Sequence, residues 1–250
     1  MEPEIVITRV AERHWHALED DRVVGRGEAS PRPDGRIFLS IDSWHRVVFD
    51  RIAGTMLADL PTPLYTVVDE ADRDLAAHWR QAGFTTRRRE WEYAVPTDVK
   101  VVTPPAGVTI VPVGAADEGR LRELDRAIRA EVETGIGWHA MPAEVLPRPA
   151  GDTIVDPSKY SVAVRDGRYV ALVRVTGRLR IARIGLIAVR AEHQRRGIGK
   201  ALLTSALDSL HDKGTETASA DVHEANEAAT ALFEGVGARR ASSNLELVLR

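Results

Sequence analysis

The hydrophobic residues among the first ninety-five positions recur at two different spacings, one typical of strands and one typical of helices. Short runs in which apolar and polar residues alternate predict strands, and apolar residues three or four positions apart predict helices. The predicted strands are EIVITRV, RVVGRGE, RIFLSI, LYTVVD and residues 88–95, with turn signals at Asp20-Asp21 and Asp34-Gly35. The predicted helices span residues 44–60 and 71–81, and the buried face of the first is predicted to hold Trp44, Val47, Val48, Ile52 and Met56.

The same order of elements recurs in the rest of the chain. A strand GVTIVPV and a helix over 117–133 are followed by an irregular segment, 134–151, rich in Gly, Pro and Trp. A hairpin turning at Asp166-Gly167 and a long strand RLRIARIGLIAV come next. The chain then gives a helix over 197–213, a strand ETASADV, a helix over 225–235 and a strand LELVLR. Because both halves close on strand, helix, glycine and strand, the pattern indicates an internal duplication.

A proline-rich segment separates the two halves. Pro96, Pro104 and Pro105 lie within VPTDVKVVTPPAGV, and proline removes a backbone donor and fixes φ. Neither a helix nor a central strand is expected to continue through it. We therefore predict a domain over residues 1–95, a linker over 96–106 and a second domain over 107–250.

Composition narrows the class of protein. The 250 residues are 44% hydrophobic and 28% charged, which is typical of a globular protein with a core. The formal net charge of −3 disfavours binding to a phosphate backbone, so no nucleic-acid partner is expected. There is no cysteine, no signal-peptide pattern at MEPEIVITRV and no apolar run long enough for a membrane helix. We expect a cytoplasmic protein without a membrane partner.

His14 and His16 share one predicted strand face but have no third ligand at a recognisable spacing, so no metal site is expected.

The most informative segment is IAVRAEHQRRGIGKALL, residues 187–203. A strand leads through a glycine-containing loop into an amphipathic helix, an arrangement that directs backbone N–H groups and the positive end of the helix dipole at one anion. Arg195, Arg196 and Lys200 are placed to bind phosphate oxygens, or else are solvated cap residues. The loop lacks the first Gly and the Ser/Thr of a Walker motif, and it lacks the third Gly of a Rossmann fingerprint.

This segment resembles the signature of the GCN5-related N-acetyltransferase (GNAT) superfamily, Gln/Arg-x-x-Gly-x-Gly/Ala. Gln194, Gly197 and Gly199 match it, directly after a strand that ends Ile187-Ala188-Val189. The resemblance covers residues 107–250 and continues into the helix of the family's second motif, at Asn226, Ala229, Phe233, Gly235 and Gly237. Residues 1–95 resemble a truncated copy whose corresponding loop, SIDSWHRVV, has no such glycines, so one cofactor site per chain is implied.

The resemblance implies a fold and an activity. The fold would be α/β (α+β by another convention), with two GNAT-like mixed β-sheet domains and flanking helices, the first domain degenerate. The activity would be that of an acetyl-CoA-dependent N-acetyltransferase, in which an amine attacks the thioester directly in a ternary complex. The acceptor would be a small-molecule or peptide amine, and the protein a monomer or homodimer. The residues implied to bind acetyl-CoA are Ile187, Ala188, Val189, Gln194, Arg195, Arg196, Gly197, Ile198, Gly199, Lys200 and Asn226.

The candidates for proton transfer lie on the strand ETASADV. Alternation places Ser219, Asp221 and His223 on one face, and Asp221 occupies the position where some family members carry a catalytic Glu. We take Asp221 and His223 as the catalytic candidates; the alternative is a polar pair bonded to neighbouring backbone. Glu131, Glu133 and His139 flank the segment expected to wall the acceptor site and are either catalytic or surface residues. Trp138 and Met141 form either an acceptor-facing patch or a loop anchor.

One departure from the family pattern supports a second hypothesis. Many members carry a tyrosine seven residues after the Asn of the second motif, and that position here is Phe233. Phenylalanine has no hydroxyl to protonate the leaving thiolate. The alternative functions are therefore a catalytically inactive acyl-CoA-binding sensor or regulatory module, and an interaction scaffold that binds no acetyl-CoA.

Overall fold

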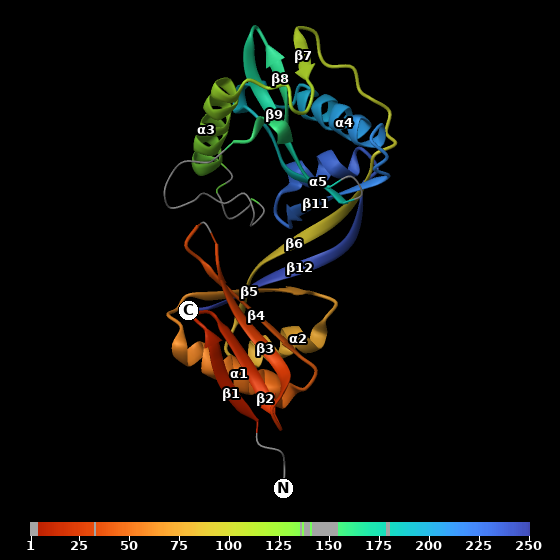
Figure 1. Ribbon diagram of the computed structural model, residues 1–250. Helices are drawn as coiled ribbons and strands as arrows, with labels where there is room; N and C mark the ends of the chain where they lie inside the picture. The colour runs from red at the N-terminus through yellow and green to blue at the C-terminus, as the bar shows by residue number, and fades with distance from the viewer. Residues whose placement is uncertain (1–4, 33, 136, 138–140, 142–154, 179–180) are drawn as a thin grey trace. The chain divides into compact units, whose positions relative to one another are not determined.

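The computed structural model describes residues 5–32, 34–135, 137, 141, 155–178 and 181–250 of the chain (Figure 1). Two compact units can be distinguished by their internal contacts. One comprises Met1–Arg89 with Ser242–Arg250, and the other comprises Glu90–Ala241. We refer to them as unit 1 and unit 2. Two strands, β6 (Thr85–Pro96) and β12 (Arg239–Leu249), contribute residues to both.

Unit 1 is a mixed sheet with helices. Its strand order is β1-β2-β3-β4-β5-β12. The β2–β3 hairpin turns at Asp20 and Asp21, with φ of 48° and 60°, as the sequence predicted. The elements are β1 (Val6–Ala11), β2 (His14–Glu19), β3 (Arg22–Pro31), β4 (Ile37–Ser43), α1 (Arg46–Asp59), β5 (Leu64–Asp69) and α2 (Arg73–Gln81).

Helix α1 lies directly on the sheet of unit 1. Its buried residues include Val48, Ile52 and Met56, as predicted. Gly25 and Gly27 of β3 make the close approach possible, because a Cβ at Gly27 would lie 2.5 Å from the Met56 sulfur and 2.6 Å from Ile52 Cγ2. The prediction for the start of this helix was wrong. Trp44 precedes the N-cap residue and is 91% exposed, and Val47 in the first turn is also exposed.

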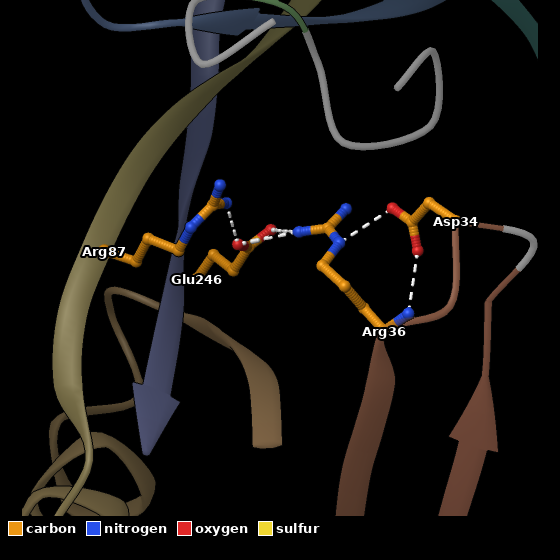
Figure 2. A network of polar contacts seen from close by, with 4 residues as sticks. All are labelled: Asp34, Arg36, Arg87 and Glu246. Atoms are coloured by element: carbon orange, nitrogen blue, oxygen red, sulfur yellow. Dashed lines mark hydrogen bonds and ion pairs between the residues drawn. The ribbon is translucent and has the colours of Figure 1, made fainter. Parts of the chain in front are cut away.

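A buried set of charges holds β12 in unit 1 (Figure 2). The Glu246 carboxylate is only 3% exposed, and its two oxygens accept hydrogen bonds from Arg36 Nη1 at 3.0 and 3.1 Å. Arg87 of β6 also pairs with Glu246, and Arg36 Nε donates to Asp34 at 2.7 Å. Backbone pairing agrees, because residues 244–249 run antiparallel to β5. Residues 242–250 therefore group with unit 1, whereas the predicted domain over 107–250 includes them in the second; the predicted domain bounds stay a prediction.

Unit 2 has the strand order β6-β11-β10-β9-β8-β7. The β8–β9 hairpin turns at Asp166 and Gly167, both with positive φ, as expected. Residues of the predicted linker are bonded to this unit, since Thr97 Oγ1 donates to the Glu216 carbonyl at 2.9 Å. The elements are β7 (Val108–Val111), α3 (Glu118–Thr134), η3 (Pro157–Lys159), β8 (Tyr160–Arg165), β9 (Arg168–Arg178), β10 (Ile181–Val189), η4 (Ala191–His193), α4 (Ile198–His211), β11 (Thr217–His223) and α5 (Glu227–Glu234).

Helices cover both faces of the sheet in unit 2 (Figure 1). Alternate residues of β9 point to opposite faces, so Ala171 and Val173 pack with α4 and α5, whereas Leu172 packs with α3. On β10, Ile184 packs on the α4 face and Leu186 on the α3 face, although they are only two residues apart. A register shift between these two residues explains the switch. An extra residue in a strand moves the side chains that follow it to the opposite face of the sheet.

None of the described helices is long and apolar enough to cross a membrane. The expected cytoplasmic location stays a prediction.

Candidate active site

A cavity of about 530 Å³ lies in unit 2 at the point where β10 and β11 separate. The two parallel strands pair at Ala182–Ala218 and Arg183–Ser219, and no further pair forms over the described residues 184–189 and 220–223. The edge of β10 that faces β11 is therefore left without strand pairing there, while the other edge stays bonded to β9 as far as Val189. Side chains or backbone of β10, β11, α3, α5 and the loop before α4 line the cavity.

The glycine-containing loop lies at the mouth of this cavity and begins α4. Gly197 is the N-cap residue, with φ of 81°, a left-handed conformation that glycine adopts without strain. Arg195 also has a positive φ, 59°. Because glycine has no side chain to cap the helix, the first N–H groups of α4 are left for another acceptor. The first turn carries no acidic residue, so the dipole of this end favours an anion.

Gln194 and Gly199 connect this loop to the open edge of β10. The Gln194 side-chain amide donates to the Val189 carbonyl at 2.9 Å. A Cβ on Gly199 would lie 3.3 Å from Val189 Cγ2, which is tight for two carbon atoms. The absence of a side chain at Gly199 thus keeps the loop and the strand end close together.

Nine of the eleven predicted cofactor-binding residues line the cavity. They are Ile187, Ala188, Val189, Gln194, Arg195, Gly197, Gly199, Lys200 and Asn226. The other two do not belong to the lining: Ile198 is 1% exposed and packs in the core, and the Arg196 side chain is exposed. Asn226 has a structural bond as well, because its Oδ1 caps α5 by accepting from the Ala229 N–H at 3.0 Å.

The two catalytic candidates have different surroundings. Asp221 lines the cavity and forms an ion pair with Arg183 of β10, while its Oδ1 is buried and has no hydrogen-bond partner among the described residues. Burial raises the pKa of Asp221 above its usual value, and the nearby Arg183 charge opposes the rise. His223 is buried, does not belong to the cavity lining, and accepts the Ala225 N–H at its Nδ1 at 3.0 Å. Asp221 is therefore the better-placed proton acceptor of the two.

Comparison of the sequence with known protein families identifies the part of the chain that forms this cavity. The model of the Acetyltransferase (GNAT) family matches residues 129–238, which contain the loop, both splayed strands and α5. Residues 129–238 therefore form a GNAT acetyltransferase domain. The chain is an N-acetyltransferase of mixed α/β fold, as the sequence predicted.

Similarity to relatives and solved structures is not confined to residues 129–238. The chain is 26% identical over 246 residues to the mycothiol acetyltransferase of Kytococcus sedentarius, covering 93% of this chain and 80% of the relative. It is 41% identical over 56 residues, or 22% of this chain and 38% of the relative, to the [ribosomal protein bS18]-alanine N-acetyltransferase of Escherichia coli. A GCN5-related N-acetyltransferase from Sphaerobacter thermophilus has the same fold, with a TM-score of 0.70 and 14% identity over 97% of this chain and 82% of that one. So does a tandem GNAT protein of the clavulanic acid biosynthesis pathway, with a TM-score of 0.65 and 18% identity over 94% and 82%.

Helix α3 supplies the wall of the cavity opposite α5. Ile128, Glu131 and Val132 line it, together with Met141, which is 7% exposed. The spacing of Ile128 and Val132 on the predicted helix was the available signal for this wall. Glu133 is exposed on the same helix, whereas Trp138 and His139 lie outside the described residues.

Phe233 lines the cavity at the position where the family often has tyrosine. It is 3% exposed and stacks on Tyr93 of β6, with ring centroids 6.1 Å apart. The Tyr93 hydroxyl donates to Glu234 and accepts from Arg240 Nε, both at 3.0 Å. Tyr93 does not belong to the cavity lining, so its hydroxyl does not replace the one that Phe233 lacks.

Proposed function

We propose that unit 2 binds acetyl-CoA in the gap between β10 and β11 and transfers the acetyl group to an amine. One observation carries the proposal: a single cavity joins an unpaired strand edge, an uncapped helix N-terminus and a carboxylate whose pKa is raised. Each part matches one need of the reaction. The edge offers peptide groups to an extended amide-containing arm, the loop offers N–H groups to phosphates, and the carboxylate accepts a proton.

The residues of the loop fit a pyrophosphate. The N–H groups of the first turn of α4 provide hydrogen bonds, and Arg195 and Lys200 add positive charge at the same end of the cavity. The Gly197 and Gly199 positions allow the backbone to approach the phosphates closely. Arg196 is exposed beside this loop, and we propose a long-range charge contribution for it rather than a cavity contact.

The chemistry we propose is direct attack by the amine. The new N–C bond forms as the thioester C–S bond breaks, and the ammonium proton passes to Asp221. The Val189 N–H is the proposed donor to the carbonyl oxygen as it gains negative charge. The thiolate leaves with a proton from solvent; because a thiol has an ordinary pKa near 8.5, the thiolate is a tolerable leaving group without a dedicated acid. Holding both reactants in one cavity supplies much of the rate.

The acceptor that we propose is a small-molecule or peptide amine. Relatives are named for mycothiol and for an alanine of a ribosomal protein, one a small molecule and the other a polypeptide. Ile128, Val132 and Met141 give the wall an apolar part beside the Glu131 carboxylate, and we propose that an apolar group next to the amine packs on that part. Unit 1 has no glycine-containing loop before α1, and one acetyl-CoA per chain is expected.

The test has two parts. Titration calorimetry with acetyl-CoA is expected to show saturable binding, and an assay of free thiol over a panel of primary amines is expected to show steady release with at least one of them. Saturable binding with no thiol release over the whole panel would favour a sensor or regulatory module instead. Absence of acetyl-CoA binding by the folded protein would contradict the proposal itself.

A further inference from the structure

One carboxylate of the cavity wall has no role in the reaction proposed above. Glu131 lies in the last turns of α3, and its side chain is 28% exposed. Its Oε1 accepts a hydrogen bond from Arg190 Nε at 2.5 Å, and its Oε2 accepts one from the backbone N–H of Ala191 at 2.8 Å. Both oxygens of Glu131 therefore accept hydrogen bonds from two consecutive residues that lie far from it in the sequence.

Those two residues form the junction between the parts of the proposed acetyl-CoA site. Val189 ends the open strand edge, and Gln194 begins the glycine-containing loop. Between them lies a single 3₁₀ turn, η4, whose first residue is Ala191. Because the first N–H groups of a helical turn have no partner within it, the Glu131 carboxylate caps this turn from another helix.

Other bonds fix the junction from the strand side. The Arg190 N–H donates to the Val170 carbonyl of β9 at 2.9 Å, and Gln194 closes the loop back on the Val189 carbonyl. Glu131 supplies the contact from the opposite, α3 side of the sheet. The turn is thus held between β9 and α3, and its position sets the spacing between the strand edge and the loop.

We propose that Glu131 is a positioning residue for acetyl-CoA. Its carboxylate fixes the turn at 190–191, and through it the separation of the 187–189 edge and the 194–199 loop, so that one molecule can contact both. Since both oxygens are bonded to Arg190 and Ala191, Glu131 acts through the turn and not as a base. This inference rests on the proposed function of unit 2.

The experiment compares Glu131→Ala with Glu133→Ala, a control at an exposed glutamate two residues further along the same helix. Acetyl-CoA affinity is measured by calorimetry on variants whose folding is verified by circular dichroism. We expect the Kd of Glu131→Ala to rise about tenfold, because the turn loses both of its hydrogen bonds to the charged carboxylate. The Kd of Glu133→Ala is expected to stay within about twofold of the wild type, because that side chain is exposed and away from the cavity.

A second comparison separates the bond to Ala191 from the ion pair. In an Arg190→Met background the cation is gone, and Glu131→Gln still offers a carbonyl oxygen to the Ala191 N–H. We expect Glu131→Gln to bind acetyl-CoA as the Arg190→Met parent does, while Glu131→Ala in that background binds several-fold more weakly. A merely structural ion pair predicts equal affinities for the two.

Two results would overturn the inference while leaving the proposed function standing. One is a folded Glu131→Ala protein with the wild-type Kd for acetyl-CoA, whatever its melting temperature. The other is equal affinity of the Gln and Ala variants in the Arg190→Met background. A wild-type protein that binds no acetyl-CoA overturns the proposed function, and this inference with it.

Discussion

Asp221 combines an ion pair with a buried oxygen that has no hydrogen-bond partner in the described part of the chain, and this combination determines how the site should depend on pH. Burial raises its pKa above the usual value, so the carboxylate is a stronger base than an exposed aspartate. The unpartnered Oδ1 belongs to a residue that lines the cavity, where an ammonium ion would satisfy it. A base must be deprotonated to act, so activity is expected to be lost as the pH falls through the raised pKa.

Replacing Asp221 by Asn tests this role. The amide keeps the shape but accepts no proton, so kcat is expected to fall by roughly 10²- to 10⁴-fold, and the acidic limb of the pH profile that belongs to Asp221 should disappear. Asp212→Asn, at an exposed position after α4, is the control and should leave both unchanged. An Asp221→Asn enzyme with wild-type kcat would show that another group takes the proton.

Phe233 gives a second prediction at the scale of the residue. Phe233→Tyr adds a hydroxyl to a ring that already lines the cavity. If the thiolate leaves without a dedicated acid, turnover should change by less than about tenfold, or about 1.4 kcal/mol of barrier. The measurement is steady-state thiol release with an active amine. Activity that appears only in the tyrosine variant would instead favour the sensor or regulatory module.

At the scale of elements, the loop before α4 depends on the size of one residue. A side chain at Gly199 would lie against Val189, the last residue of the open strand edge. Gly199→Val is therefore expected to weaken acetyl-CoA binding by at least about tenfold while costing the fold about 1–3 kcal/mol, the usual effect of overpacking. Calorimetry measures the first and chemical denaturation the second.

A matched glycine distinguishes this effect from a general response to substitution. Gly54 lies within α1, and a Cβ there would meet nothing within 4 Å. Gly54→Ala should raise the free energy of unfolding by roughly 0.5–1 kcal/mol, because alanine favours the helix, and should leave acetyl-CoA affinity unchanged. If both glycine variants lost affinity alike, the loop would not be the site of the effect.

Most elements could be predicted from the sequence because their patterns are local. The loop at 194–199 was recognisable from Gln194 and its glycines, and the turn at Asp166-Gly167 from a dipeptide that tolerates positive φ. The buried side of α1 was predicted except at its start, where Trp44 continues the apolar spacing although it lies outside the helix. The contact of Glu131 with Ala191 could not be predicted, because sixty positions separate the two residues and no local pattern connects them.

At the scale of the whole molecule, both units have a pair of parallel strands that separate after two residue pairs, but only in unit 2 does a glycine-containing loop lie beside the gap. In unit 1, β4 and β5 pair only at 37–38 with 64–65 among the described residues, as β10 and β11 do in unit 2. However, α1 starts without a glycine loop, and its residues pack onto Gly25 and Gly27. Titration of the full chain should therefore give one acetyl-CoA per chain. Two equivalent sites would show that unit 1 binds as well.

The charges around Glu246 make a further prediction for unit 1. Glu246→Ala removes the 3% exposed carboxylate that pairs with Arg36 and Arg87, and leaves the half-buried Arg36 with Asp34 alone (Figure 2). Removing one partner of a buried ion pair costs up to about 3–5 kcal/mol; because Arg36 keeps Asp34 and Arg87 is partly exposed, we expect a loss of about 2–3 kcal/mol on denaturation. Glu227→Ala, at an exposed position in the first turn of α5, is the control and should cost less than about 1 kcal/mol. A Glu246→Ala protein as stable as that control would contradict the assigned role of the cluster.

The pairing of residues 244–249 with β5 also bears on how the protein is made. A ribosome completes residues 1–95 long before it adds 242–250, yet unit 1 requires those later residues beside β5. Until they are synthesised, the nascent first half exposes the backbone groups of β5 as an open edge, a surface on which other chains can pair. This half of the chain therefore cannot complete its sheet until the last residues are synthesised, and a gene fragment that encodes only residues 1–95 lacks the segment that pairs with β5.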